Sequence, residues 1–257
     1  MNRNKTVWLM GLGVVLILAA CWPQMAAIPP KAAVAAAGVP QAGASTGTVS
    51  GKISFEGARP KLAQIDMSKD PVCAAAVSDP GYVEDGKVNP NGTLPNVFVF
   101  VKAGLEKSSF RPPSRPVTLD QRGCTYYPHV LGIMVGQPLR ILNSDPTTHN
   151  THLTPKYNRD WNRSQPPGGA PLVHKFMHPE IMIPVHCNLH PWMRAYVGVT
   201  TNPSYAVTQS QGTFTLKGLP PGEYTIEAWT ATFGTQEKKV TVQPGRSTQL
   251  DFTFKAH

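Results

Sequence analysis

Short runs of alternating apolar and polar residues recur along this chain from residue 47 onwards. Between Thr48 and Glu56, the odd-numbered positions Val49, Gly51, Ile53 and Phe55 are small or apolar and the even-numbered ones are polar. A period of two indicates a half-buried β-strand. Residues 97–101 are instead continuously apolar, which predicts a strand covered on both faces.

The C-terminal quarter predicts four further strands with turns between them. Their apolar positions are 214 and 216, then 224, 226 and 228, then 240 and 242, then 250, 252 and 254. Proline and glycine at 218–222 and 243–245 are typical of turns. Long helical periodicity is absent after residue 21, so we expect an all-β protein. A chain of 257 residues accommodates one or two domains.

The N-terminus has the pattern of an export signal. Arg3 and Lys5 precede an apolar stretch from Thr6 to Ala20, as in secretory signal peptides. The segment ending in Cys21 resembles the lipobox of bacterial lipoproteins, which implies a signal peptide over residues 1–21 and acylation of Cys21. The alternatives are a signal cleaved further on and an uncleaved anchor running to Ile28. All three predict an exported protein, periplasmic or at the cell surface, and the lipobox predicts a lipid anchor in a bacterial membrane.

Residues 22–46 are rich in alanine and proline and contain one charged residue, Lys31. We interpret them as a linker between the membrane and the folded part. The formal charge of the whole chain is +9, and the basic residues are scattered, which predicts a generally basic surface. No run combines aromatic residues with arginine or lysine, so nucleic acid is not an expected partner.

The end of the chain resembles a known type of β-sandwich. Residues 211–216 and 219–226, Gln-Gly-Thr-Phe-Thr-Leu and Leu-Pro-Pro-Gly-Glu-Tyr-Thr-Ile, are similar to the prealbumin-like, carboxypeptidase-regulatory sandwich. That fold begins with a Gly-x-Val-x-Gly strand and an apolar strand, which occur here far upstream. The resemblance therefore implies a discontinuous sandwich formed by residues 47–104 and 204–257, with residues 105–203 inserted. The alternative is two domains in series.

Three soft metal donors lie within seven residues of the inserted segment. Cys187, His190 and Met193 offer a thiolate, an imidazole and a thioether, a combination that suits copper in two valence states. Upstream, a predicted strand over residues 139–143 leads through an acidic loop to His149 and Asn150. Only one of positions 149 and 152 of an extended segment can face Cys187, and the resemblance of His149-Asn150 to the His-Asn pair of a copper-protein family, the cupredoxins, favours His149 over His152.

These residues resemble the cupredoxin family, and the C-x2-H-x2-M spacing is similar to that of amicyanin-type blue copper proteins. The resemblance implies a Greek-key β-sandwich over residues 105–203. It implies one mononuclear type 1 copper site with His149, Cys187, His190 and Met193 as ligands, and a backbone amide of Asn150 near the Cys187 sulfur. In this family the edge of the second histidine is the electron exit, so we expect His190 to reach the surface. Zinc is a weaker alternative, because it seldom uses methionine.

Two neighbours of the ligands allow other interpretations. Trp192 lies either at the surface beside the electron exit at His190 or packed in the interior of the sandwich. His186 directly precedes Cys187, an arrangement that in copper nitrite reductases and multicopper oxidases connects a blue site to a second copper. A second site would need partners such as His129, His174 or His178, whose spacing does not support it, and we expect no enzymatic activity.

The remaining cysteines are Cys73 and Cys124. If Cys21 is acylated and Cys187 binds metal, these two are free to form a disulfide in an oxidising compartment. A second metal site that uses cysteine is the alternative.

The sequence thus predicts an exported blue copper protein that carries single electrons between redox partners, such as a c-type cytochrome or another donor or acceptor. One alternative is a copper-binding protein for storage or delivery. Another is a surface protein whose prealbumin-like sandwich binds carbohydrate or peptide.

Overall fold

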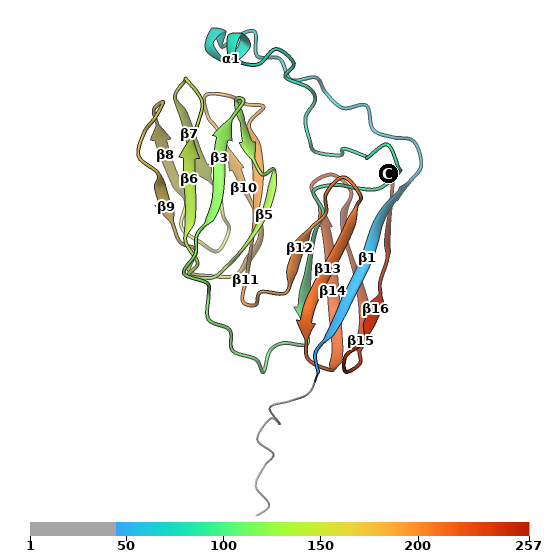
Figure 1. Cartoon of the computed structure of the whole chain (residues 1–257). Coiled ribbons are helices and arrows are strands. Elements are labelled where there is room, and N and C mark those ends of the chain that lie inside the picture. Colours follow the sequence, from blue (N-terminus) through green and yellow to red (C-terminus); the bar gives the residue numbers. More distant parts are fainter. Residues whose placement is uncertain (1–44, 257) are drawn as a thin grey trace, which may run out of the picture. The chain divides into compact units, whose positions relative to one another are not determined.

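The structure, a computed structural model, describes residues 45–256. This part of the chain is nearly all-β, with seventeen strands and one six-residue helix (Figure 1). The predicted signal peptide, the acylation of Cys21 and nearly all of the linker lie outside the described residues. Within residues 45–256, no helix combines the length and the apolar character needed to cross a membrane.

The first sandwich contains strands from both ends of the described chain. One sheet has the order β13-β1-β16, with β17 also paired to β1, and the other has the order β12-β2-β14-β15. Their bounds are β1 Gly47–Glu56, β2 Phe98–Ala103, β12 Tyr205–Val207, β13 Thr213–Leu219, β14 Gly222–Thr230, β15 Gly234–Val242, β16 Ser247–Gln249 and β17 Phe252–Lys255. The segments 47–103 and 205–255 therefore share the same two sheets.

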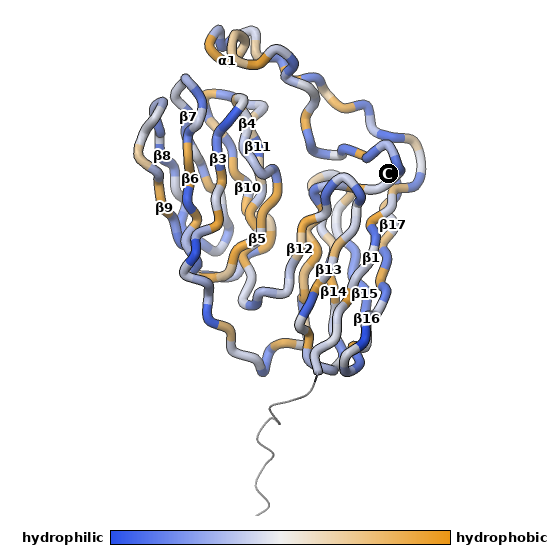
Figure 2. Tube along the Cα trace, in the orientation of Figure 1, coloured by the Kyte–Doolittle hydropathy of each residue, from blue (hydrophilic) through white to orange (hydrophobic). Residues whose placement is uncertain are grey.

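The second sandwich is formed by the strands between these segments. Its sheets have the orders β5-β11-β10-β7-β8 and β4-β3-β6-β9. Their bounds are β3 Val117–Arg122, β4 Thr125–Tyr127, β5 Val130–Met134, β6 Leu139–Asn143, β7 His149–Leu153, β8 Trp161–Gln165, β9 Leu172–His174, β10 Glu180–His186 and β11 Arg194–Thr200. Between β1 and β2, a long irregular segment carries the helix α1, Pro71–Ala76. Figure 2 shows hydrophobic residues along the strands, as this layering requires.

Strand β1 follows its sequence pattern. Val49 and Ile53 are fully buried, whereas Ser50 and Lys52 are not. Gly51 occupies an inward position at which a Cβ atom would lie 1.8 Å from the carbonyl oxygen of Leu250. The alternation prediction is thus confirmed, and only glycine permits the close approach of the last strands.

Strand β2 is buried on both faces, as its continuous apolar run predicts. Val99 and Val101 belong to the core of the first sandwich. Phe98 and Phe100 point the other way, into a cluster that includes Val130 of the second sandwich. Apolar residues are therefore required at positions 98–101, where each face lies against a core, whereas Lys102 near the end of the strand is exposed.

One strand prediction is wrong in detail. The alternating positions 250, 252 and 254 predict a single last strand, but β16 ends at Gln249 and β17 begins at Phe252. At the break, the backbone N–H of Lys52 donates to the carboxylate of Asp251 at 2.8 Å. A side chain thus replaces a backbone acceptor of the ladder, which interrupts the pairing.

Candidate metal centre

His149 is positioned by a loop that closes on itself. The loop joins β6 to β7, and the side-chain amide of Asn143 at its start donates to the carbonyl oxygen of Thr147 at 2.9 Å. The backbone N–H of Asp145 donates to Asn143 Oδ1 at 3.0 Å. His149 begins β7 and is completely buried. The loop therefore directs both His149 and Asp145 into the interior.

The loop from Cys187 to Met193 is tight and begins and ends beside paired strands. Cys187 directly follows β10 and Met193 directly precedes β11. The Cys187 N–H donates to the Met193 carbonyl at 3.3 Å, and the Met193 N–H donates to the His190 carbonyl at 2.9 Å. Both sulfur-containing side chains are buried in the core of the second sandwich.

Three of the four predicted ligands converge. One nitrogen of His149, the Cys187 sulfur and one nitrogen of His190 all lie within 4.8 Å of one another. The two Nδ1 atoms are 2.8 Å apart, and His190 Nδ1 is 3.6 Å from Cys187 Sγ. Met193 is fully buried and packs in the same core cluster as Cys187. The structure thus brings the imidazole of His149 together with the thiol and the imidazole of the loop between β10 and β11.

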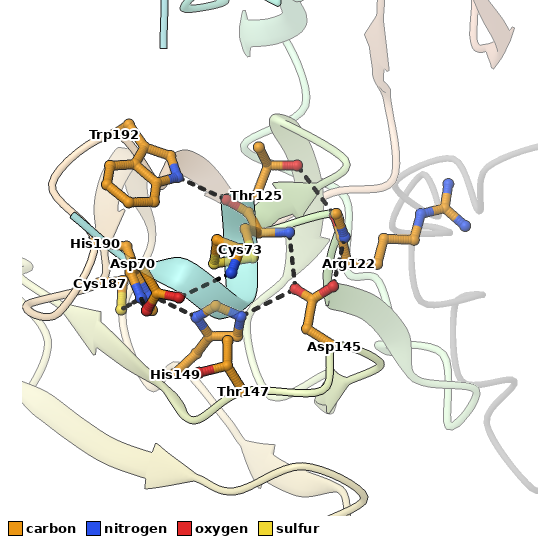
Figure 3. The surroundings of a disulfide bond; sticks show 12 residues. Asp70, Cys73, Arg122, Thr125, Asp145, Thr147, His149, Cys187, His190 and Trp192 are labelled. Carbon is orange, nitrogen blue, oxygen red and sulfur yellow. Dashed lines mark hydrogen bonds and ion pairs between the residues drawn. A yellow bond between two sulfur atoms is a disulfide. The ribbon is translucent and has the colours of Figure 1, made fainter. Parts of the chain in front are cut away.

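Two carboxylates fix the orientation of the imidazoles. His149 Nε2 lies 2.9 Å from the carboxylate of Asp145, and His190 Nε2 lies 2.7 Å from the carboxylate of Asp70 (Figure 3). An ionised carboxylate only accepts hydrogen bonds, so each Nε2 carries a hydrogen. The two Nδ1 atoms lie 2.8 Å apart, a hydrogen-bond distance at which one nitrogen carries a proton and the other accepts it, and a metal ion could replace that proton.

The donor set fits copper. Two imidazole nitrogens and one thiolate, with a methionine in the same loop, are the ligands of type 1 copper sites. Histidines that bind a metal through one nitrogen commonly donate the other N–H to a carboxylate, which orients the ring. Both histidines of this site have such a partner.

The surroundings also favour the ionised form of the Cys187 thiol. Burial raises the pKa of this thiol, but hydrogen bonds from His149 and from the backbone amides of Asn150, Leu189 and His190 lower it to about 7. Burial lowers the pKa of His149, but Asp145 and the Cys187 thiolate outweigh that effect and raise it to about 9. These contacts therefore favour the thiolate form of Cys187 and the protonated form of His149.

Asn150 connects the two loops that supply the donors. Its side-chain oxygen Oδ1 lies 3.3 Å from the Cys187 sulfur and accepts a hydrogen bond from the Asn188 N–H at 2.8 Å. The Tyr126 hydroxyl donates to its carbonyl oxygen at 2.5 Å. Asn150 thus contacts Cys187 and Asn188 of the second loop and is not one of the three converging donors.

The expectation that His190 reaches the surface is wrong. Its side chain is only 4 % exposed, because Asp70 lies against its Nε2 edge. Asp70 is the N-cap of α1, and residues 70–77, here termed the cap, belong to the irregular segment between β1 and β2. The cap, whose sequence has no periodic pattern, thus covers the edge of His190 that the cupredoxin resemblance predicts to be exposed.

A disulfide attaches the cap to the second sandwich. It joins Cys73 of α1 to Cys124, whose Cα atoms are 5.8 Å apart. The Trp192 indole N–H donates to the Cys124 carbonyl at 2.9 Å, and the Trp192 ring lies 5.1 Å from the His190 ring (Figure 3). Trp192 therefore packs against both the disulfide and His190.

Four other histidines of residues 45–256 are not among the three converging donors. His152 contacts Asn188 and Asp160 through its two ring nitrogens, and its ring lies 4.5 Å from that of His186. His129 is paired with Asp85, and His174 packs against Trp161 and Phe176. Among residues 45–256, the clusters that could hold a metal do not include His186.

A groove reaches Cys187 along a path that does not involve the cap. It has a volume of about 550 Å³ and is lined by His186, Cys187, Arg194 and Tyr196, among others. None of the residues that line this groove belongs to the cap, and the Cys187 side chain itself is only 2 % exposed.

Sequence reasoning missed both carboxylates that orient the imidazoles. Asp145 could have been found, because it lies in the acidic loop four residues before His149. Asp70 is 120 residues from His190 and is not part of any recognisable motif, so the sequence contains no signal for its role.

Comparisons with known proteins give one family match and weak structural similarities. The family model of the carboxypeptidase regulatory-like domain matches residues 190–255, a range that contains β11 to β17. The resemblance of the C-terminal region to this domain is confirmed. The search of curated proteins found no match.

Three solved structures illustrate the structural similarities. A Cu-containing nitrite reductase (NirK) from Thermus scotoductus SA-01 is 20 % identical with a TM-score of 0.32, over 45 % of this chain and 27 % of that one. This chain thus spans about a quarter of the reductase. A purple cupredoxin from Nitrosopumilus maritimus is 21 % identical with a TM-score of 0.28, over 32 % of this chain and 98 % of that one. A mutant of amicyanin in its reduced Cu(I) form is 18 % identical with a TM-score of 0.31, over 40 % of this chain and 98 % of that one.

Proposed function

We propose that this chain is a type 1 copper protein that carries single electrons between redox partners. The observation that supports this most strongly is the convergence of three donors: the Nδ1 atoms of His149 and His190 lie 2.8 Å apart, and His190 Nδ1 lies 3.6 Å from the Cys187 sulfur. His149, Cys187 and His190 would hold the copper, with Met193 as the weak fourth ligand. Bound copper supplies a one-electron couple.

Neighbouring side chains and backbone groups keep these donors fixed. Asp145 and Asp70 hold the two imidazoles through Nε2, and the backbone amide of Asn150 stabilises the Cys187 thiolate. Rigid donors limit the rearrangement that accompanies a change of charge, which favours rapid electron exchange. The short loop between β10 and β11 contributes to the same rigidity.

The same proposal covers the organisation of the chain and its setting. Residues 47–104 and 204–257 would form one discontinuous domain that supports the copper domain, residues 105–203. The signal-like N-terminus supports export and a lipid anchor at Cys21 in a bacterial membrane. A c-type cytochrome or another exported redox protein would then be the partner.

One observation favours a second candidate function, copper storage or delivery. The cap covers the edge of His190, which an electron carrier of the cupredoxin type would present to its partner. A covered centre is compatible with storage of copper and also with electron transfer. The two candidates differ in whether bound copper cycles reversibly between its valence states.

Voltammetry of the copper-loaded protein distinguishes the candidates. An electron carrier shows a reversible one-electron couple, and Met193→Leu should retain copper but shift its potential. Absence of a reversible couple in protein with one bound copper would favour storage or delivery. Loss of all copper from Met193→Leu would show that the ligand set is wrong.

A further inference from the structure

A large cavity lies beside the candidate metal centre. Its volume is about 760 Å³, which is within the range of small-molecule sites. Tyr82, from the irregular segment between β1 and β2, lines one part of it, and Tyr127 and Trp192 of the second sandwich line another. None of the four proposed copper ligands is among its lining residues, so the cavity is a separate feature of the fold.

Trp192 connects this cavity to the candidate metal centre. Its ring lies 5.1 Å from the ring of His190 (Figure 3), a separation typical of packed aromatic pairs. Trp192 is half-buried and lines the cavity, whereas Asp70 covers the edge of His190. The Trp192 ring is therefore a path from His190 to the cavity that leaves the cap in place.

The cavity presents exposed aromatic rings and a cation. Tyr82 and Tyr127 are 59 % and 56 % exposed, so their rings remain open to a ligand. The guanidinium carbon of Arg122 lies 3.8 Å from the centre of the Tyr127 ring. Within residues 45–256, Arg122 forms no ion pair with a carboxylate. A planar ring with an acidic group thus finds both an aromatic surface to pack on and a cation to pair with.

Several other polar side chains of the cavity already have partners within the protein. These pairs are Asn89 with Thr93, Asn96 with Glu84, and Asp85 with both His129 and Tyr196. A sugar needs many free hydrogen-bonding groups around it, because each of its hydroxyls loses water on binding. The cavity therefore favours an aromatic acid over a carbohydrate.

We propose that this cavity binds a small phenol that carries an acidic group, and that Trp192 passes an electron from the phenol to the copper centre. The inference rests on the proposed function, because Cu(II) at that centre is the electron acceptor. A phenol fits this role, because its electron-rich ring gives up one electron more readily than an unsubstituted ring does.

The reaction is a one-electron oxidation of the phenol. Its hydroxyl O–H bond breaks, the proton passes to water and a phenoxyl radical remains. The electron passes through the rings of Trp192 and His190 and reduces Cu(II) to Cu(I). Trp192 thus acts through His190 as a relay and is not itself a copper ligand.

Binding is tested on the metal-free, full-length protein with hydroquinonesulfonate, a phenol with a sulfonate group, as the probe. Equilibrium dialysis should show one bound probe per chain, and Arg122→Gln should weaken binding about threefold, as expected for the loss of one exposed ion pair. Arg111→Gln is the matched control, because Arg111 is exposed and does not line the cavity. No binding to the wild-type protein, or equal affinities of the two variants, would overturn the proposed site.

The relay is tested by the rate at which the same probe reduces the copper-loaded protein. This rate should saturate with probe concentration, and its limiting value is divided by the rate with dithionite, so that a change in the copper centre itself affects both. The ratio should fall in Trp192→Leu and stay close to the wild-type value in Trp192→Phe, which keeps an aromatic ring. An unchanged ratio in Trp192→Leu would overturn the relay role.

The two measurements separate this inference from the proposed function. A copper-loaded protein without a red absorption band would contradict the copper proposal, and dialysis of the metal-free protein would still decide whether the cavity binds the probe. A red band together with failed dialysis would overturn the cavity site alone.

Discussion

The carboxylate of Asp70 accepts a hydrogen bond from His190 Nε2 at 2.7 Å, although the two residues are 120 positions apart. Asp70 is the N-cap of α1, and His190 lies in the loop between β10 and β11. This contact orients one imidazole of the candidate metal centre and covers its outer edge. The cap is thus part of the centre, while its sequence belongs to the segment between the first two strands of the other sandwich.

Replacing Asp70 by alanine should open and weaken the centre. Loss of a carboxylate partner of a metal-binding histidine commonly lowers metal affinity by about 10-fold to 100-fold. We expect a decrease of this size in copper affinity, together with faster modification of His190 by diethyl pyrocarbonate. Asp79→Ala is the matched control, because Asp79 is exposed and bonds only the Gly81 N–H. Equal copper affinities in the two variants would contradict the role of Asp70.

The two histidines of β7 should differ sharply in their contribution to metal binding. His149 is buried beside Cys187 and His190, whereas His152 is partly exposed and contacts Asp160. His149→Ala should abolish stoichiometric copper binding, and His152→Ala should leave it intact. Copper content after gel filtration measures both. Retention of copper by His149→Ala would show that another residue supplies the second nitrogen.

Metal affinity should depend on pH in a defined range. The pKa of Cys187 is about 7 and that of His149 is raised from 6.5 to about 9. Metal binding therefore displaces one proton, from His149, between these values. Affinity should rise about tenfold per pH unit from about pH 7 to about pH 9 and become constant above that. Titration with a competing chelator at several pH values measures this.

The same raised pKa of His149 makes the stability of the metal-free fold fall as pH rises, whereas metal affinity rises. The folded state binds the His149 proton more tightly than the unfolded state does, so this group stabilises the fold fully below pH 6.5 and the stabilisation is lost as pH rises through about 9.

Asp145→Asn removes the carboxylate that raises the pKa of His149 and should move the upper limit of the metal-affinity rise to lower pH. An unchanged limit would contradict the assigned cause.

Reduction of the disulfide should lower the stability of the fold substantially. Cys73 and Cys124 are 51 residues apart, and a cross-link closing a loop of that length stabilises a protein by about 4 kcal/mol through the unfolded state. Denaturant unfolding of oxidised and reduced protein compares the same sequence in two forms. A difference below about 1 kcal/mol would show that the tether of the cap contributes little.

The sequence pattern predicts the strands whose burial is regular, either at alternate residues or at consecutive ones. The alternation along β1 and the continuous apolar run of β2 both correspond to their burial. The last strand is misjudged because Asp251 interrupts the ladder with its own side chain. Periodicity reports which residues are buried, and it does not report which atom accepts a given backbone hydrogen.

The donors of the candidate centre are also predictable, whereas its surroundings are not. Cys187 and His190 have diagnostic spacing, and His149 is distinguished from His152 by the residue that follows it. The cap has no such pattern, because its contact with His190 depends on the path of an irregular segment and on one disulfide. The burial of His190 could therefore be learned only from the structure.

The absorption spectrum of the copper-loaded, oxidised protein tests the central claim most directly. Full-length wild-type protein with one equivalent of Cu(II) should show an intense band in the red that arises from thiolate-to-copper charge transfer. Cys187→Ala should lose the band while keeping the circular dichroism of a folded β protein. A wild-type protein that binds copper without this band, or a Cys187→Ala protein that keeps it, would contradict a type 1 copper site at these residues.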